Sequence, residues 1–304
     1  MIVSSNLDGG WPMAVAERPA WVDDELFPFE SRFIDIDGHR IHYVDEGSGP
    51  TLLFLHGNPT WSFDYRDIIS SLRDEFRCVA VDYPGFGLSV AAPGYRFLPA
   101  EHAQVIAGFV QALGLSGVTL VAHDWGGPIG LATVEKRPEA FNRLVLTNTW
   151  AWPISAPLVQ TMSHVMGSPI GRLLIRQLNL FVNVMIPIGH RLTKPTDKQM
   201  AHYRKALDTP ARREASAVFP REITASRAFL ADVEAGLHEL AALPTLILWG
   251  DGDFAFGDAE LRRWQQILTD HRTVVVKGAG HFVPSDAPEQ FASAIRDWHA
   301  PAGS

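Results

Sequence analysis

Short apolar segments recur along the chain, separated by longer stretches with the apolar periodicity of a surface helix. Each segment has three to five residues rich in β-branched or aliphatic side chains, the pattern of strands buried on both faces. Residues 32–44 instead alternate in polarity around Asp37-Gly38, a typical hairpin turn. Strands alternating with helices such as Glu101–Leu113 predict a mostly parallel sheet covered by helices on both sides. The apolar segments are Thr51–Leu55, Cys78–Val81, Val118–Ala122, Leu144–Leu146, Thr245–Trp249 and Thr273–Val276.

The alternation of strands and helices stops after Thr149 and resumes at Leu243. Residues 152–240 show helical periodicity that prolines divide into short helices, and they contain no convincing strand. We therefore predict an α/β core, residues 27–151 and 241–304, with a helical cap inserted at 152–240. A cap over the carboxyl ends of parallel strands encloses a substrate well.

Residues 1–26 indicate an irregular N-terminal arm, because they contain Gly9-Gly10, Pro12 and Pro19. The arm also carries Trp11 and Trp21, which we expect to pack on something, such as a neighbouring subunit.

The composition indicates a globular protein: 46% of the 304 residues are hydrophobic and 20% are charged. With 34 acidic against 26 basic side chains the net charge is −8, so we expect no nucleic-acid partner. No apolar run reaches the roughly 20 residues of a membrane helix, and the first residues lack the pattern of a signal peptide. We therefore expect a cytoplasmic protein with no membrane partner. The one cysteine, Cys78, fits a reducing compartment and a buried strand position.

The strongest chemical signal is Val121-Ala-His-Asp-Trp-Gly-Gly127, which follows an apolar strand and precedes a helix. A nucleophile elbow has this form: small residues flank a sharp turn that lifts the nucleophile off the sheet. Asp124 stands where many hydrolases have serine, and the helix N-terminus favours its carboxylate. Taken alone, the motif also fits an aspartate that only caps a helix.

Two later strand ends carry a histidine and a pair of acids. His281 follows the strand Thr273–Val276 within Gly-Ala-Gly-His-Phe, where a general base is expected. Asp251 and Asp253 follow the strand Thr245–Trp249, and at least one of them belongs to an acidic turn. The order nucleophile, acid, histidine is that of the α/β-hydrolase fold.

Three motifs resemble the haloalkane dehalogenases over roughly residues 27–300. They are His56-Gly-Asn-Pro-Thr-Trp61, Asp82-Tyr-Pro-Gly-Phe-Gly-Leu-Ser89 and His123-Asp-Trp-Gly-Gly127. The resemblance implies that Asp124 is the nucleophile and His281 the base. It offers two positions for the acid. One is occupied here by Asn148, which cannot be an anion, so the acid is expected at Asp253.

The resemblance also implies a halide site formed by Trp125 and Asn58. No tryptophan lies between residues 153 and 248, so the cap cannot supply the second donor that one branch of the family uses. An Asn–Trp halide site with an aspartate acid resembles the third subfamily, whose self-association makes a homo-oligomer possible.

The mechanism implied is hydrolytic dehalogenation of small apolar haloalkanes. Asp124 forms an alkyl ester, Trp125 and Asn58 stabilise the departing halide, and His281, oriented by Asp253, activates water. By analogy with the fold, the backbone N–H groups of Asn58 and Trp125 form the oxyanion hole. Neither a metal nor an organic cofactor is expected. Candidate pocket residues are Phe181, Met185 and Phe219, each of which also fits the core of the cap, and Phe282 beside His281, which is equally uncertain as a pocket residue.

Two other functions compete with this one. An epoxide hydrolase has the same triad but protonates its substrate with cap tyrosines, and Tyr203 is the only tyrosine in the predicted cap. A non-catalytic binding protein of the hydrolase fold is the alternative from another class, and an intact triad argues against it.

Overall fold

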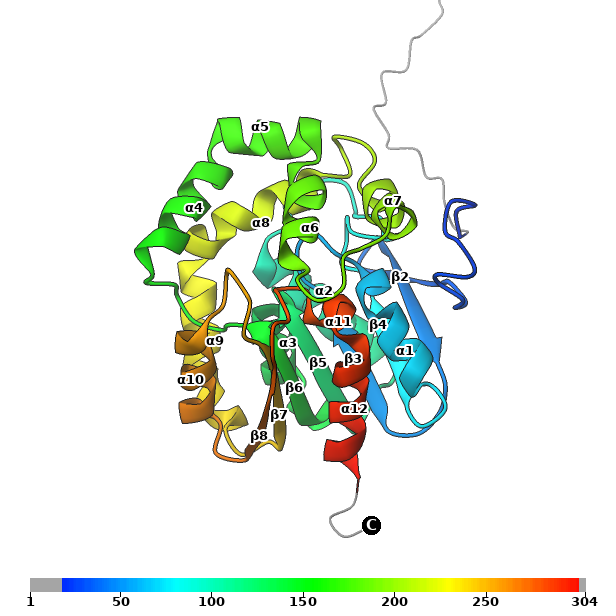
Figure 1. Ribbon diagram of the computed structural model, residues 1–304, viewed down its shortest axis with the longest axis vertical. Coiled ribbons are helices and arrows are strands. Elements are labelled where there is room, and N and C mark those ends of the chain that lie inside the picture. The colour runs from blue at the N-terminus through cyan, green and yellow to red at the C-terminus, as the bar shows by residue number, and fades with distance from the viewer. Residues whose placement is uncertain (1–17, 301–304) are drawn as a thin grey trace, which may run out of the picture.

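The computed structural model describes residues 18–300, which form an eight-stranded sheet between layers of helices (Figure 1). The strand order is β1-β2-β4-β3-β5-β6-β7-β8, with β2 antiparallel to both of its neighbours and all later pairs parallel. This arrangement confirms the predicted mostly parallel sheet. The strands are β1 (Arg32–Ile36), β2 (His39–Glu46), β3 (Thr51–Leu55), β4 (Arg77–Val81), β5 (Val118–Asp124), β6 (Phe141–Thr149), β7 (Thr245–Gly250) and β8 (His271–Val276).

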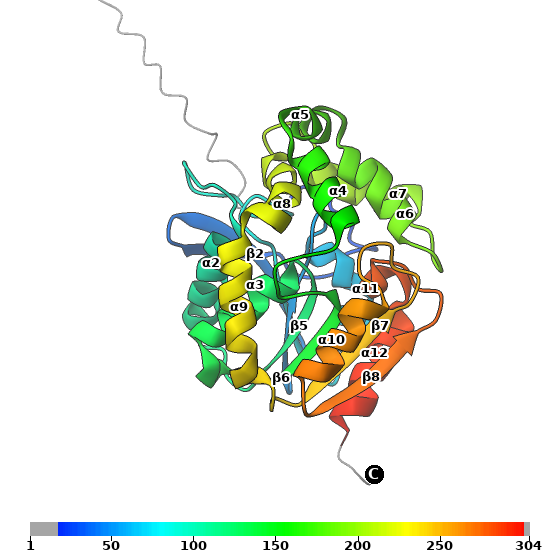
Figure 2. The ribbon, with the colours of Figure 1, turned by 90° about the vertical axis from the view of Figure 1, so that its left-hand side faces the viewer.

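Central strands bury side chains on both faces, which explains their continuous apolar segments. Leu53 and Leu55 of β3 join one apolar layer, whereas Leu52 and Phe54 join the other. Figure 2 shows the sheet between these layers. The first layer contains α2 (Pro99–Ala112), α3 (Gly126–Lys136), α9 (Arg227–Leu240) and α10 (Asp258–Ile267). The second contains α1 (Arg66–Leu72) and α12 (Pro288–His299).

The observed strands differ from those predicted by the apolar pattern mainly in their length. β6 runs from Phe141 to Thr149, well beyond the predicted Leu144–Leu146, because polar residues at its end still pair with β5. The predicted hairpin is confirmed. Asp37 and Gly38 both have positive φ, and the residues flanking them pair directly across the two strands.

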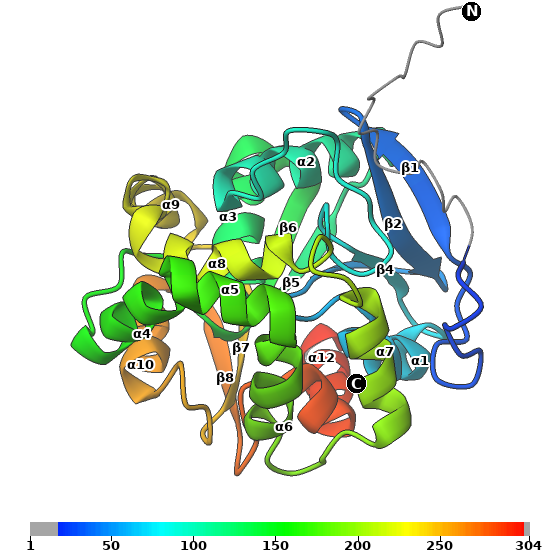
Figure 3. The same ribbon diagram turned by 90° about the horizontal axis from the view of Figure 1, so that it is seen from above.

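The inserted helical segment divides into two parts. Most of it lies over the end of the sheet at which β5 and β7 finish (Figures 1 and 3). This part comprises α4 (Pro157–Gly167), α5 (Pro169–Leu178), the π-helical turn η3 (Phe181–Met185), α6 (Ile186–Gly189), α7 (Asp197–Ala206) and α8 (Glu214–Ala225). In contrast, α9 packs against α3 on a face of the sheet. We therefore propose that the cap ends near Ser226, not at residue 240.

The N-terminal arm packs on its own chain from Arg18 onward; Trp11 lies outside the described residues. The Trp21 ring is 6.0 Å from that of Trp61 in the core and 6.0 Å from that of His202 in α7. The Asp23 N–H donates to His202 Nε2 at 3.0 Å. Contacts within one protomer, with both core and cap, thus account for Trp21.

None of the helices in residues 18–300 has the length and apolar content needed to cross a membrane. Cys78 is buried in β4, where burial raises the pKa of its thiol to about 12. It is therefore an unreactive core residue, as predicted.

Candidate active site

Asp124 ends β5 in a sharp backbone turn. Its φ of 50° is in the left-handed region that few non-glycine residues adopt. Helix α3 begins two residues later at Gly126, where a Cβ atom would collide with the carbonyl oxygen of Leu55. Glycine there lets the helix approach the sheet closely. The turn places the Asp124 carboxylate beside the positive end of α3.

His281 connects Asp124 with Asp253. His281 Nδ1–H donates to Asp253 Oδ2 at 3.0 Å, and His281 Nε2 lies 3.8 Å from Asp124 Oδ2. All three side chains are at least 89% buried. Burial by itself disfavours the imidazolium, but the Asp253 and Asp124 carboxylates outweigh this effect and raise the pKa of His281 to about 9.

Two further polar residues hold these groups in place. Asn148 Nδ2 donates to Asp253 Oδ2 at 2.9 Å, while Asn148 Oδ1 accepts the Gly250 N–H at 2.8 Å. His123 Nε2–H donates to the His281 carbonyl oxygen at 2.8 Å. Burial lowers the pKa of His123 well below its ordinary value, so this histidine is neutral.

The two oxygens of Asp124 have different surroundings. Oδ1 accepts the Asn58 backbone N–H at 2.8 Å, and Oδ2 faces His281. The backbone N–H of Trp125, like that of Asn58, favours the charged form of the carboxylate. Burial raises the pKa of Asp124, against the opposing effects of His281 and these two N–H groups. The carboxylate therefore has one oxygen held by a backbone donor and one directed toward the histidine.

A proline in the cap explains how the Asn58 side chain is oriented. Pro220 lies inside α8 and has no N–H, so the carbonyl of Ser216, four residues earlier, loses its helical partner. Asn58 Nδ2 donates to this carbonyl at 3.4 Å. One amide N–H is thus tied to the cap, and the other is available to the cavity that Asn58 lines.

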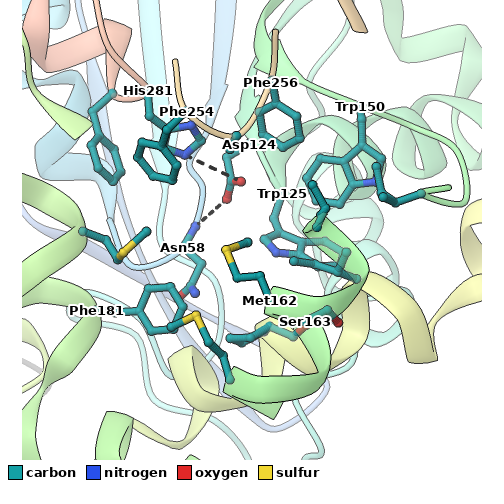
Figure 4. A pocket seen from close by; sticks show the side chains of 18 residues that line it. Asn58, Asp124, Trp125, Trp150, Met162, Ser163, Phe181, Phe254, Phe256 and His281 are labelled. Atoms are coloured by element: carbon teal, nitrogen blue, oxygen red, sulfur yellow. Dashed lines mark hydrogen bonds and ion pairs between the residues drawn. The ribbon is translucent and has the colours of Figure 1, made fainter. Parts of the chain in front are cut away.

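Trp125 is held between two aromatic rings. Its ring centroid is 4.7 Å from that of Trp150 and 4.8 Å from that of Phe219. Figure 4 shows the indole nitrogen turned toward the side of the cavity on which Asn58 lies, below Asp124. Two N–H donors therefore face one region next to the carboxylate.

The cavity between Asp124 and the cap is mostly apolar and has a volume of about 710 Å³, part of it open to solvent. Core residues form one side of the cavity, and α4, η3 and α8 of the cap form the opposite side (Figure 4). The lining residues are Asn58, Asp124, Trp125, Trp150, Ile154, Val159, Met162, Ser163, Met166, Phe181, Met185, Pro220, Ile223, Phe254, Ala255, Phe256, His281 and Phe282. Within residues 18–300, no group of three or more His, Cys, Asp or Glu side chains could hold a metal ion.

Comparisons with known proteins agree with this fold and show the family. A sequence profile of the α/β-hydrolase fold matches residues 50–288. Haloalkane dehalogenase 2 of Mycobacterium tuberculosis is 45% identical over 277 residues, which span 90% of this chain and 96% of the relative. The chain belongs to the haloalkane dehalogenase family.

Two further similarities extend this result. The crystal structure of haloalkane dehalogenase DatA from Agrobacterium tumefaciens superimposes with a TM-score of 0.81 at 27% identity, covering 88% of this chain and 95% of that one. A cis-3-alkyl-4-alkyloxetan-2-one decarboxylase of Shewanella oneidensis is 30% identical, covering 90% of this chain and 89% of the relative. The family scaffold is therefore shared with a relative named for another reaction.

Three of the four candidate pocket residues line the cavity: Phe181, Met185 and Phe282. Phe219 does not. It packs behind Trp125 and stacks on His102, because its position on α8 directs the ring toward the core. Phe219 therefore supports the indole of Trp125 and is not part of the cavity wall.

Sequence reasoning missed several residues of this site. Met162 and Met166 of α4 line the cavity, and their spacing of four is the only sequence signal for a shared helix face. His123 adjoins the nucleophile, but nothing in the sequence indicates its bond to His281. In the sequence, Asn148 stands out only as a position without an acid, whereas the structure makes it a donor to Asp253.

Proposed function

We propose that the protein hydrolyses the carbon–halogen bond of small apolar haloalkanes, with Asp124 as nucleophile, His281 as base and Asp253 as the supporting acid. The observation that carries the proposal is the arrangement around one carboxylate. Asp124 faces a mostly apolar cavity, with His281 on one side and the Asn58 and Trp125 N–H groups on the other. The products are an alcohol, a halide ion and a proton.

In the first step Asp124 Oδ2 attacks the carbon that bears the halogen. Oδ2 is the available oxygen, since Oδ1 accepts the backbone N–H of Asn58. The new C–O bond forms as the carbon–halogen bond breaks, and the bonding electrons leave with the halide. Because a halide accepts no proton at neutral pH, Trp125 Nε1–H and Asn58 Nδ2–H stabilise its charge as it develops.

In the second step water hydrolyses the alkyl ester. His281 removes a proton from the water, and Asp253 stabilises the imidazolium that results. Asp124 Oδ1 is now the ester carbonyl oxygen and becomes the oxyanion. The Asn58 N–H that holds the carboxylate in the free protein then stabilises this oxyanion, so no donor has to move during the reaction.

Bromide release from brominated alkanes tests the proposal. Asp124→Ala should release none, since no other carboxylate takes its place. His281→Ala should still form the alkyl ester, so mass spectrometry after exposure to substrate should show a covalent adduct. Release of bromide at the wild-type rate by the Asp124 variant would contradict the assignment of the nucleophile.

The structure weakens the epoxide hydrolase alternative. The hydroxyl of Tyr203 donates to Asp64 Oδ1 at 2.9 Å, and Tyr203 is not among the residues lining the cavity. The tyrosine donors that an epoxide would need from the cap are therefore not at the site.

We keep one second candidate, decarboxylation of a β-lactone, because of the similarity to the oxetan-2-one decarboxylase. The same first step applies: Asp124 attacks C4 of the ring, and the departing group is the substrate's own carboxylate. Breaking the bond between C3 and this carboxylate then gives CO₂ and an alkene, and the electron pair returns to Asp124.

His281 separates the two reactions. Ester hydrolysis consumes water and needs a base, whereas the decarboxylative elimination transfers no proton. His281→Ala should therefore stop bromoalkane turnover after one adduct and still convert a cis-3,4-dialkyl β-lactone to alkene. If neither His281→Ala nor the wild type forms alkene from the lactone, the second candidate is wrong.

A further inference from the structure

Large apolar side chains are exposed almost only on the cap. Nine of the eleven exposed large hydrophobic residues in the described chain lie between residues 158 and 192; the other two are Phe254 and Val275. Six of the nine are on α4 and α5, which cross the top of the molecule in Figure 1 and face the viewer in Figure 3. We name these six the cap face: Leu158, Val165, Ile170, Leu173, Leu174 and Leu178.

Helix α5 has the reverse of the usual polarity of a surface helix. Its exposed residues Ile170, Leu173, Leu174 and Leu178 have the spacing of an apolar stripe. Its arginines, 172 and 176, instead both pair with Glu214 of α8. The fold of the cap therefore leaves the stripe uncovered, which is typical of an interaction surface.

The charge of the cap is opposite to that of the rest of the chain. Residues 153–225 contain ten Lys and Arg against four Asp and Glu, a net charge of +6. The remainder, with 16 against 30, carries −14. Arg172 and Arg221 line a groove with Leu173, and Arg204, Lys205 and Arg213 line another with Leu178, in which Asp208 is the one acidic residue. The cap face is thus an apolar surface bordered by cations.

These observations select one kind of partner. A second copy meeting this one cap to cap would bring two positive surfaces together, which is unfavourable. A second copy meeting the cap with its core would offer Phe254 and Val275 as the only exposed large apolar residues within residues 18–300. An anionic lipid surface provides both hydrocarbon for the leucines and phosphates for the arginines.

We propose that the cap face docks on an anionic lipid bilayer, with α4 and α5 lying in the plane of its surface. This differs from the sequence-based expectation of no membrane partner, which rested on the absence of a span. A helix that lies in the interface needs only one apolar face. Met162 and Met166 line the cavity from the same helix, α4, that carries Leu158 and Val165 outward. Docking therefore holds the cavity about one helix diameter, roughly 10 Å, from the lipid.

Co-sedimentation of the full chain with vesicles tests the proposal without reference to the reaction. The wild type should sediment with vesicles of phosphatidylcholine and phosphatidylglycerol, and more weakly with phosphatidylcholine alone. Leu173→Gln and Leu174→Gln should each lower the partition coefficient about tenfold, as expected for losing the immersion of one leucine. Arg221→Gln should weaken binding about fivefold, and only on the anionic vesicles.

Val275→Gln provides the matched control. Val275 is 44% exposed, close to the 41% of Leu174, but it lies on β8, in the α/β part of the protein and outside the cap. This variant should bind vesicles as the wild type does. The proposal is overturned if the wild type stays in the supernatant with anionic vesicles, or if Leu173→Gln sediments unchanged. It is also overturned if sedimentation velocity shows a wild-type oligomer that Leu173→Gln dissociates, because the cap face would then belong to a second copy.

Discussion

His281 should lose a proton when Asp124 is alkylated, before the ester is hydrolysed. In the free protein the Asp253 and Asp124 carboxylates overcome the effect of burial and raise the pKa of His281 to about 9. At neutral pH the imidazole is therefore protonated and cannot accept a proton from water. Alkylation converts Asp124 to a neutral ester and removes one of the anions that hold this proton.

The structure sets the size of the effect. His281 Nε2 and Asp124 Oδ2 are 3.8 Å apart, so unit charges there interact by about 4 kcal/mol at an effective dielectric constant of about 20. At 1.36 kcal/mol per pH unit this equals about 3 units. Loss of the Asp124 charge should thus lower the pKa of His281 from its value of about 9 in the free protein. The base should then be neutral in the ester intermediate, where hydrolysis requires it.

Stopped-flow mixing with a bromoalkane and a pH indicator in weak buffer at neutral pH can time this proton. One proton should be released in the first turnover together with bromide, at the rate of alkylation, and none later at the rate of ester hydrolysis. His281→Ala is the control, because it should release bromide without the early proton. Proton release only at the rate of hydrolysis would show that His281 is neutral in the free protein, and would refute the reasoning.

Three further predictions concern other parts of the site and its support. Trp125→Phe keeps the ring but deletes the N–H, so alkylation in single-turnover assays should slow about 100- to 1,000-fold, and a change of less than about tenfold would exclude the indole as a halide donor. Asp253→Asn should slow ester hydrolysis by orders of magnitude, whereas Asp251→Asn should alter it little, since Asp251 accepts the Gly278 N–H at 2.6 Å in a surface turn; the reverse result would move the acid to Asp251. Burial raises the pKa of Asp64 from 3.8 to about 6, so this group costs the wild type about 3 kcal/mol of stability as pH rises from about 4 to about 6. The free energy of unfolding of Asp64→Asn, measured by denaturant unfolding, should therefore rise by this amount relative to that of the wild type from pH 4 to pH 7. A difference between the two proteins that stays the same at both pH values would contradict the burial of a titrating carboxyl.

The local pattern of the chain was enough to predict the sheet, the hairpin and the sharp turn at Asp124. Strands buried on both faces must be continuously apolar, so Thr51–Leu55 and Val118–Ala122 are recognisable without any knowledge of their neighbours. A sharp turn that requires glycine next to a strand end also depends only on neighbouring residues in the sequence. The segment around Asp124 and Gly126 therefore indicates a nucleophile elbow without knowledge of the rest of the fold. Because strand ends of a parallel sheet meet at one edge, the order of Asp124, Asp253 and His281 along the chain already predicted one site.

Tertiary structure alone decided what surrounds that site. The bond from Asn148 to Asp253 joins residues 105 positions apart, and no periodicity encodes it. Phe219 is apolar and aromatic, as a pocket residue would be, but the direction of α8 places its ring behind Trp125. The cap face has the apolar spacing of an ordinary buried stripe, so sequence cannot distinguish it from helix core. Which side of α5 faces solvent depends on the pairing of its arginines with Glu214 of α8, a contact between helices that only the folded chain brings together.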